Sequence, residues 1–256
     1  GLDEKTIYNQ NQPALMNGNC TFKLRSVKNT KFLLVFTLLF TNFYYLFAQS
    51  PQEKVTSYLK NTSAYYGLKS GDMSDFEITS HHVSSVSGIQ HIYFTQRYAG
   101  ISIFTTESSA HFQNTGSLFT ANNLFISDLK ESIQGDGTPD LTPVQAIEKV
   151  SAELGYQQLG NLFVMQYLGG KEQKSIIARG QISIEDIPVK LKYFPFRTRS
   201  TVSNSTVKDN IVLAWEMYIY EPNQLNYWHI LADATTGKIL FKNNLVVNCG
   251  FGRSEE

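Results

Sequence analysis

Large apolar residues alternate with polar ones most regularly near the end of the chain. In residues 213–220 (LAWEMYIY) every second residue is a large apolar one, which is the period of a β-strand with one buried face. Residues 227–232 (YWHILA) repeat this alternation after a short polar break. Residues 233–237 (DATTG) then favour a tight turn, because Asp233 can accept hydrogen bonds from nearby backbone N–H groups and Gly237 tolerates left-handed backbone. The pattern predicts an antiparallel meander that holds both tryptophans of the chain and should carry the densest core contacts of this half.

A helical pattern followed by several strand patterns precedes this meander. Ser50 can cap a helix that begins at Pro51, and Glu53 completes a capping box. Gly67 is suited to end that helix. From Asp75 the apolar period becomes that of strands separated by short turns, and the expected strands are residues 76–84, 89–98, 101–112 and 117–126. These elements predict an antiparallel sheet whose apolar face is covered by the helix.

The same order of elements recurs in the second half of the chain. Residues 127–140 are mostly polar and rich in glycine, so they form the predicted boundary. Thr142, Pro143 and Gln145 repeat the capping pattern at the start of a second apolar stripe. Strands are expected at residues 162–168, 182–184 and 189–194, and an exposed loop at residues 198–210. The predicted fold class is α+β, with two helix-plus-antiparallel-sheet units in tandem over residues 49–130 and 141–247.

An apolar run with basic residues before it lies near the start of the sequence. Residues 32–47 (FLLVFTLLFTNFYYLF) follow four Lys and Arg residues and precede Ala48, as in a secretory signal peptide. A membrane anchor is the alternative, but the run is shorter than the ~20 residues that span a bilayer and Asn42 interrupts it. We therefore expect residues 32–48 to be the hydrophobic region of a signal peptide that is cleaved after Ala48. Residues 1–31 are then an N-terminal extension and signal n-region, expected to be disordered, and membrane contact is expected only through the signal peptide.

Charge and cysteine content exclude some classes of function. Lys and Arg number 22, as do Asp and Glu, and the chain after residue 48 is slightly acidic. This balance gives no electrostatic reason to expect a nucleic-acid partner. The two cysteines, Cys20 and Cys249, cannot build a disulfide framework. If Cys20 leaves with the signal peptide, any partner of Cys249 lies beyond this chain.

No catalytic constellation is recognisable in the sequence. A zinc peptidase site of the His-Glu-x-x-His type needs two histidines four residues apart on a helix. No two of the five histidines have that spacing, and they are His81, His82, His91, His111 and His229. The sequence also lacks a Gly-x-Ser-x-Gly nucleophile elbow and a phosphate-binding P-loop. We therefore assign no catalytic residues, no metal ligands and no cofactor to this chain.

The meander resembles a PepSY domain, in particular the one found in propeptides of fungalysin-type secreted zinc metallopeptidases. The resemblance rests on Leu-Ala-Trp at residues 213–215, Trp-His at 228–229 and Asp-Ala-Thr-Thr-Gly at 233–237. The positions that carry this PepSY motif are Trp215, Trp228, Asp233, Thr236 and Gly237.

A second stretch, residues 96–104 (QRYAGISIF), resembles the fungalysin/thermolysin propeptide motif. That family's pattern is Gln, an aromatic residue, Gly, and then an aliphatic pair that ends at a strand. The positions that fall on it are Gln96, Tyr98, Gly100 and Ile103. Ser102 departs from the pattern, because proline is more usual there and would stiffen the turn. These residues also suit a simple hairpin with a buried aromatic side chain, and the two interpretations are compatible.

Together the two resemblances imply a fungalysin/thermolysin propeptide-like unit followed by a PepSY-like, or cystatin-like, unit. They imply a secreted propeptide that inhibits a zinc metallopeptidase and assists its folding, extracellular or periplasmic before export. The chain is then a non-enzymatic fragment of a metalloendopeptidase precursor. Its catalytic domain, which would carry the zinc, is absent from this chain and is the expected partner, in cis or in trans. Residues 248–256 are the expected linker towards it.

Two other functions are compatible with the sequence. The chain could be a stand-alone secreted PepSY-type protein that binds and inhibits a separate protease. It could also be an enzyme with an unrecognised site. A stop codon directly after residue 256 together with inhibition in trans favours the first, whereas zinc content or peptidase activity of the purified chain favours the second.

Overall fold

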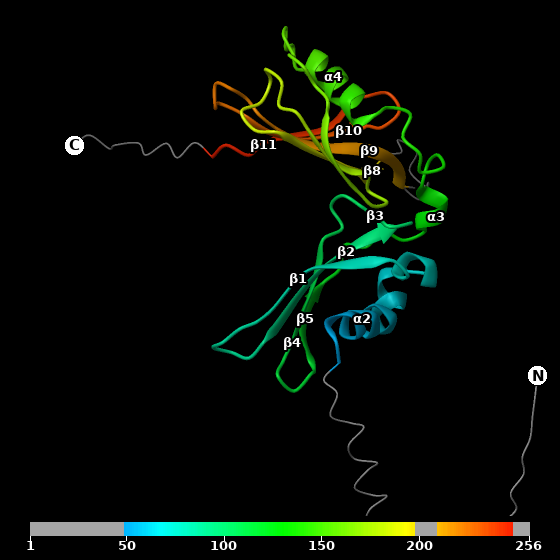
Figure 1. Cartoon of the computed structure of the whole chain (residues 1–256). Helices are drawn as coiled ribbons and strands as arrows, with labels where there is room; N and C mark the ends of the chain where they lie inside the picture. Colours follow the sequence, from blue (N-terminus) through cyan, green and yellow to red (C-terminus); the bar gives the residue numbers. More distant parts are fainter. Residues whose placement is uncertain (1–48, 198–208, 248–256) are drawn as a thin grey trace, which may run out of the picture. The chain divides into compact units, whose positions relative to one another are not determined.

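The computed structural model describes residues 49–197 and 209–247, all of which belong to one compact unit, Gln49–Glu256 (Figure 1). Antiparallel strands dominate this part of the chain and a few helices accompany them, so its fold class is α+β as predicted. The predicted signal peptide, the extension before it, Cys20, Cys249 and the linker at residues 248–256 all lie outside the described residues. No helix among the described residues is long and apolar enough to cross a membrane.

The first helix, α2 (Pro51–Tyr66), begins and ends as its sequence predicts. The Glu53 N–H donates to Ser50 Oγ at 3.2 Å, and the Ser50 N–H donates to Glu53 Oε2 at 2.8 Å. Gly67 ends the helix in the left-handed region at φ 66°. A 3₁₀ turn, η1 (Ser70–Met73), leads from the helix to the first sheet.

The first sheet has the strand order β1-β2-β4-β5, and α2 covers one of its faces (Figure 1). Its strands are β1 (Phe76–Val83), β2 (Gln90–Tyr98), β3 (Ile101–Ser102), β4 (Ser108–Phe112) and β5 (Leu118–Asn122), with β3 paired to β2. The core under the helix includes Val55, Leu59, Ile92, Phe94 and Ala110. The prediction of one strand over residues 101–112 is wrong, because the chain leaves the sheet after β3 and Thr105 adopts φ 66°.

Two short helices connect the first sheet to the second. A single turn, α3 (Leu129–Ser132), lies in the predicted boundary segment. Helix α4 (Pro143–Glu153) is capped by Thr142, whose Oγ accepts from the Gln145 N–H at 3.3 Å. Helix α4 presents Ala146, Ile147 and Val150 to the second sheet, and all three are fully buried.

The second sheet is antiparallel throughout and has the order β11-β10-β9-β8-β7-β6. Its strands are β6 (Val164–Gly169), β7 (Lys174–Ile177), β8 (Ile187–Arg197), β9 (Asp209–Tyr220), β10 (Tyr227–Asp233) and β11 (Ile239–Asn244). The prediction of a strand at residues 182–184 is wrong: this segment is a turn, in which Ser183 Oγ accepts from the Tyr220 N–H at 3.2 Å. Strand β7 was not predicted.

The predicted meander is confirmed as β9, β10 and β11. Trp215 pairs with Ala232 across the β9–β10 register and is fully buried against α4 and the neighbouring strands. Asp233 Oδ1 accepts from the Thr235 and Thr236 N–H groups at 3.0 and 2.7 Å. Gly237 closes the turn at φ 78°, so the turn forms by the mechanism that its sequence indicates.

Candidate functional site

The hairpin of residues 96–104 joins the first sheet to the second. Ala99 and Gly100 both have positive φ, as the type I′ turn of a two-residue hairpin requires. Beyond the turn, Ile103 forms a parallel bridge with Tyr193 of β8, and the Phe104 N–H donates to the Tyr193 carbonyl at 2.8 Å. The hairpin is therefore part of the backbone hydrogen bonding of both sheets.

The Phe104 side chain continues this connection onto the face of the second sheet that points away from α4. Its ring centroid lies 5.7 Å from Phe194, 6.0 Å from His229 and 4.9 Å from Phe241. These three residues come from β8, β10 and β11. Aromatic contacts of this kind add to the apolar burial, so Phe104 fixes the first unit on the second.

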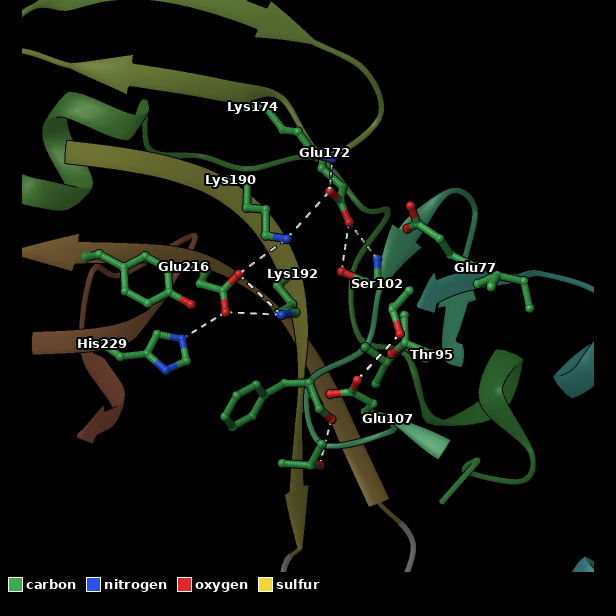
Figure 2. A pocket seen from close by; sticks show the side chains of 16 residues that line it. Glu77, Thr95, Ser102, Glu107, Glu172, Lys174, Lys190, Lys192, Glu216 and His229 are labelled. Carbon is green, nitrogen blue, oxygen red and sulfur yellow. Dashed lines mark hydrogen bonds and ion pairs between the residues drawn. The ribbon is translucent and has the colours of Figure 1, made fainter. Parts of the chain in front are cut away.

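A cavity of about 540 Å³ lies beside this hairpin and is lined by both sheets (Figure 2). The first sheet contributes Glu77 and Thr95, and the loop before β4 contributes Glu107. The second sheet and the turn before β7 contribute mainly charged side chains: Glu172, Lys174, Lys190, Lys192, Glu216 and His229.

Glu172 connects the two sheets at one end of the cavity. Its Oε1 accepts from the Ser102 N–H at 3.2 Å and from Ser102 Oγ at 2.7 Å, and Ser102 belongs to β3. Its Oε2 lies 3.1 Å from Lys174 Nζ and 3.9 Å from Lys190 Nζ. Burial raises the pKa of Glu172, but the Ser102 hydrogen bonds and the two lysines outweigh it and leave the pKa below its ordinary value.

Glu216 is the most enclosed charge in the cavity, with a side chain only 2% exposed. Lys192 Nζ lies 3.0 and 3.2 Å from its two oxygens, and Lys190 Nζ lies 3.6 Å from Oε2. His229 Nε2 lies 2.8 Å from Oε1. Burial opposes ionisation of Glu216, yet the His229 hydrogen bond and the two lysines lower its pKa to about 2. Glu216 is therefore a carboxylate at neutral pH.

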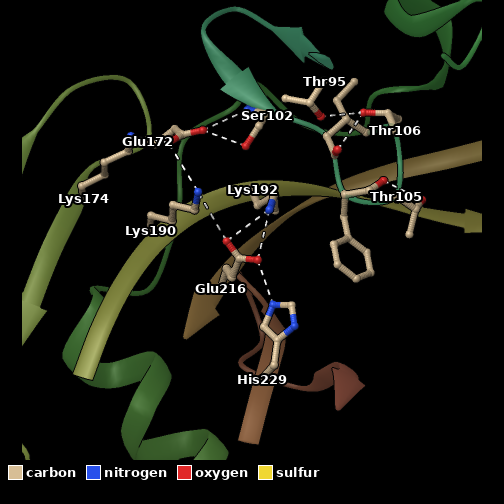
Figure 3. A network of polar contacts seen from close by, with 12 residues as sticks. Thr95, Ser102, Thr105, Thr106, Glu172, Lys174, Lys190, Lys192, Glu216 and His229 are labelled. Atoms are coloured by element: carbon tan, nitrogen blue, oxygen red, sulfur yellow. Dashed lines mark hydrogen bonds and ion pairs between the residues drawn. The ribbon is translucent and has the colours of Figure 1, made fainter. Parts of the chain in front are cut away.

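These contacts form one continuous network, drawn in Figure 3, which we call the junction network. It runs from Ser102 through Glu172, Lys190 and Glu216 to His229, because Lys190 lies within 4 Å of both carboxylates. Three lysines accompany the two acids, with Lys190 shared between them, so the charges largely neutralise one another. The arrangement holds β3 against the second sheet, and Ser102 Oγ serves as a hydrogen-bond donor to a paired carboxylate.

The structure places the residues of the predicted propeptide motif in the hairpin next to this junction. Gln96 is fully buried; its Nε2 donates to the Asp72 and Ile126 carbonyls at 3.0 and 2.8 Å, and its Oε1 accepts from the Ile126 N–H at 2.8 Å. Tyr98 packs edge-on against Tyr193 at 5.9 Å. Gly100 has φ 83° in the turn, and Ile103 is buried in the second core.

The residues of the predicted PepSY motif lie elsewhere in the second sheet. Trp215 Nε1 donates to the Leu141 carbonyl at 2.9 Å, on the face covered by α4. Trp228 Nε1 donates to Glu221 Oε1 at 2.9 Å. Asp233, Thr236 and Gly237 form the β10–β11 turn. None of these five lines the cavity, so they serve the packing of the second sheet.

Sequence reasoning missed the junction network itself. Lys190 and Lys192 occupy the polar positions of an alternating strand, and Glu216 occupies the polar position next to Trp215. These positions predict the face of the sheet that points away from the core. Only the register that pairs Lys190 with Glu216 brings their charges together. Among the described residues, no three or more His, Cys, Asp or Glu side chains are arranged to hold a metal ion.

Comparison with known families bears on the first sheet and its hairpin. Residues 74–125 match the family model FTP, the Fungalysin/Thermolysin Propeptide Motif. This part of the chain carries an FTP motif. The motif includes residues 96–104, so the resemblance found in that stretch is confirmed, and it is the motif of fungalysin- and thermolysin-type propeptides. The PepSY resemblance stays a prediction.

Comparisons over the whole chain add little to the FTP motif. No curated protein matches the sequence. The solved structures that match include the C-terminal domain of Bacillus megaterium YpeB, with 14% sequence identity and a TM-score of 0.33. That alignment covers 77% of this chain and 64% of the YpeB chain. The chain thus spans less than two thirds of that structure.

Proposed function

We propose that this chain is the propeptide region of a secreted fungalysin/thermolysin-like zinc metallopeptidase, which it keeps inactive and helps to fold. The FTP motif at residues 74–125 carries this proposal. The second sheet, with Trp215, Trp228 and the Asp233–Gly237 turn, is the proposed PepSY-like unit. Zinc and the reactive groups belong to the catalytic domain, and the chain itself contributes a binding surface.

The junction network suits such a task because its hydrogen bonds and ion pairs hold the two sheets together. A surface that binds a peptidase along both units must present them in a fixed arrangement, since any freedom between them costs entropy on binding. Ser102 with Glu172, and Phe104 in its aromatic contacts, restrict that freedom. If the chain is linked covalently to its peptidase, an effective concentration in the millimolar range makes inhibition efficient.

The proposal is tested with the purified secreted form of the chain and the catalytic domain of a fungalysin-type peptidase from the same genome. We expect stoichiometric inhibition of peptide cleavage and a higher yield of active peptidase when the denatured catalytic domain refolds with the chain. If the chain neither inhibits nor improves refolding, the proposal is wrong.

The reading frame after residue 256, together with the inhibition assay, distinguishes the tethered protein from a stand-alone inhibitor. A reading frame that continues beyond residue 256 into a His-Glu-x-x-His segment supports inhibition in cis. A stop codon at that point, together with tight inhibition in trans, supports the stand-alone protein.

A further inference from the structure

Three histidines lie side by side across the first sheet, on neighbouring strands and in register. His82 of β1 pairs with His91 of β2, which pairs with His111 of β4. The rings of His82 and His91 are stacked with centroids 4.8 Å apart, and those of His91 and His111 are also 4.8 Å apart. Ile92 and Ala110, the next residues along β2 and β4, are buried beneath α2, so this histidine row faces away from the helix.

No carboxylate faces the histidine row from the strands that surround it. Its neighbours on this face are Ser80 of β1, Tyr93 of β2, Ser109 of β4, and Thr120 and Asn122 of β5. The acids towards the cavity end of this sheet, Glu77 and Glu107, are five and four residues along the chain from the row, about 17 and about 13 Å of extended backbone. On the helix side, the nearby titratable groups are Lys54 and His81, and both contact Gln90.

The contact between His91 and His111 depends on their protonation. Their Nδ1 atoms are 2.8 Å apart, so one must carry the proton and the other must accept it. When both rings are protonated, two N–H groups point at each other and the hydrogen bond is lost. Burial, followed by the proximity of His91 and His82, lowers the pKa of His111. The folded sheet therefore opposes protonation that the unfolded chain accepts.

We propose that the histidine row is an acid-sensitive device that loosens strand β1 when the pH falls below about 6.5. Strand β1 is at the edge of the first sheet and is held on one side only, by β2, whose His91 both stacks on His82 of β1 and makes the proton-dependent contact with His111. Residues Glu77 to Thr79 in the first half of β1 line the cavity of the junction network. Where the chain holds a peptidase, which rests on the function proposed above, acidification weakens that hold. The acid response itself involves only residues of this chain and does not depend on a bound peptidase.

The direction of the effect follows from proton linkage. Because the pKa of His111 is lowered in the folded state, the unfolded or locally opened chain binds more protons between that pKa and the ordinary value of about 6.5. Stability of the row is complete above about pH 6.5 and is lost as the pH falls through this window. Partial exposure of the row and screening by salt keep the change moderate.

Hydrogen exchange of the full chain at pH 7.5 and 5.5 tests the device. We expect protection factors, corrected for the intrinsic pH dependence of exchange, to fall about 5- to 10-fold for residues 80–83 at the lower pH. Amides of α4 are the internal reference and should change little. Substitution His91→Gln removes the central imidazole of the row, together with its contact to His111, and should reduce the fall.

The matched control is His81→Gln, one residue before His82 and directed to the opposite face of β1; it should behave as the wild-type chain does. Equal protection at both pH values in the wild type, or an unchanged fall in His91→Gln, overturns the proposal. A titration of the wild-type histidines by NMR is independent of any variant. The pKa of His111 should lie below the ordinary histidine value. An ordinary pKa for His111 also overturns the proposal.

Discussion

At the scale of single residues, Glu216 shows how a buried charge is tolerated in this fold. Isolated burial of a carboxylate is costly, and it is accepted here because Lys190, Lys192 and His229 surround it. Removing one partner of such a group usually costs more than the pair contributes, because the remaining charges stay buried. The cavity beside the hairpin is therefore sensitive to single substitutions.

Acid should weaken the chain through Glu216. Its pKa of about 2 lies below the ordinary 4.5, so its contribution to stability is present above pH 4.5 and is lost as the pH falls towards 2. A shift of this size corresponds to about 3 kcal/mol of unfolding free energy. Urea unfolding at pH 7, 4.5 and 3 measures it, and Glu216→Gln should flatten the pH dependence over this range. An equally steep dependence in that variant would contradict the assignment.

Gly237 should resist substitution for two separable reasons. It has φ 78°, and a Cβ atom placed there would lie 2.7 Å from Lys149 Cβ. Gly116 also has positive φ, at 88°, but a Cβ atom there meets nothing within 4 Å. We expect Gly237→Val to lower the unfolding free energy by about 1 kcal/mol more than Gly116→Val. Thermal unfolding measures the difference, and equal losses would exclude the contact with Lys149.

At the scale of elements, the meander β9–β10–β11 is the centre of the second core. Trp215→Ala should cost about 3–5 kcal/mol, because the side chain is fully buried and its Nε1 bonds the Leu141 carbonyl. Trp228→Ala is the matched control and should cost less, since Trp228 is only partly buried and its ring is covered by Lys242 at 4.8 Å. Chemical denaturation of both variants measures this order, and a larger loss for Trp228→Ala would contradict it.

Elements were predictable where local chemistry decides them. The capping residues Ser50 and Thr142 placed α2 and α4, and the alternation in residues 213–220 placed β9. The errors came from tertiary structure. Residues 182–184 are apolar, polar, apolar like a strand, but Ile182 and Ser183 are buried in a turn against the sheet. The break after β3 depends on Thr105, which has a positive φ that its β-branched side chain disfavours.

The candidate site was less predictable than the fold. The segment of the propeptide motif could be recognised because its predicted positions, Gln96, Tyr98, Gly100 and Ile103, all lie within a few residues of one another, and the family match covers that segment. The junction network joins residues more than a hundred positions apart, such as Ser102 and Glu216, and its geometry follows from strand register. Spacing in a single sequence carries no information about that register.

At the scale of the whole molecule, the junction network should make the two sheets unfold together. We expect the wild type to unfold in one calorimetric transition. Glu172→Ala removes the acceptor of both Ser102 hydrogen bonds and should split or broaden that transition. Glu107→Ala is the control, because that cavity-lining acid has only a 3.4 Å contact with Thr79. If Glu172→Ala unfolds in one transition as sharp as that of Glu107→Ala, the network does not couple the sheets.

The aromatic contacts of Phe104 also set an order of assembly during synthesis. The ring rests on side chains of β8, β10 and β11, and β11 ends at Asn244. The first sheet can form as soon as its own strands have left the ribosome. The Phe104 ring, however, lacks part of its contacts until β10 and β11 have also emerged. A nascent chain therefore carries an incompletely covered phenylalanine from the synthesis of Phe104 until that of β11, and the last strand to appear is one of those that cover it.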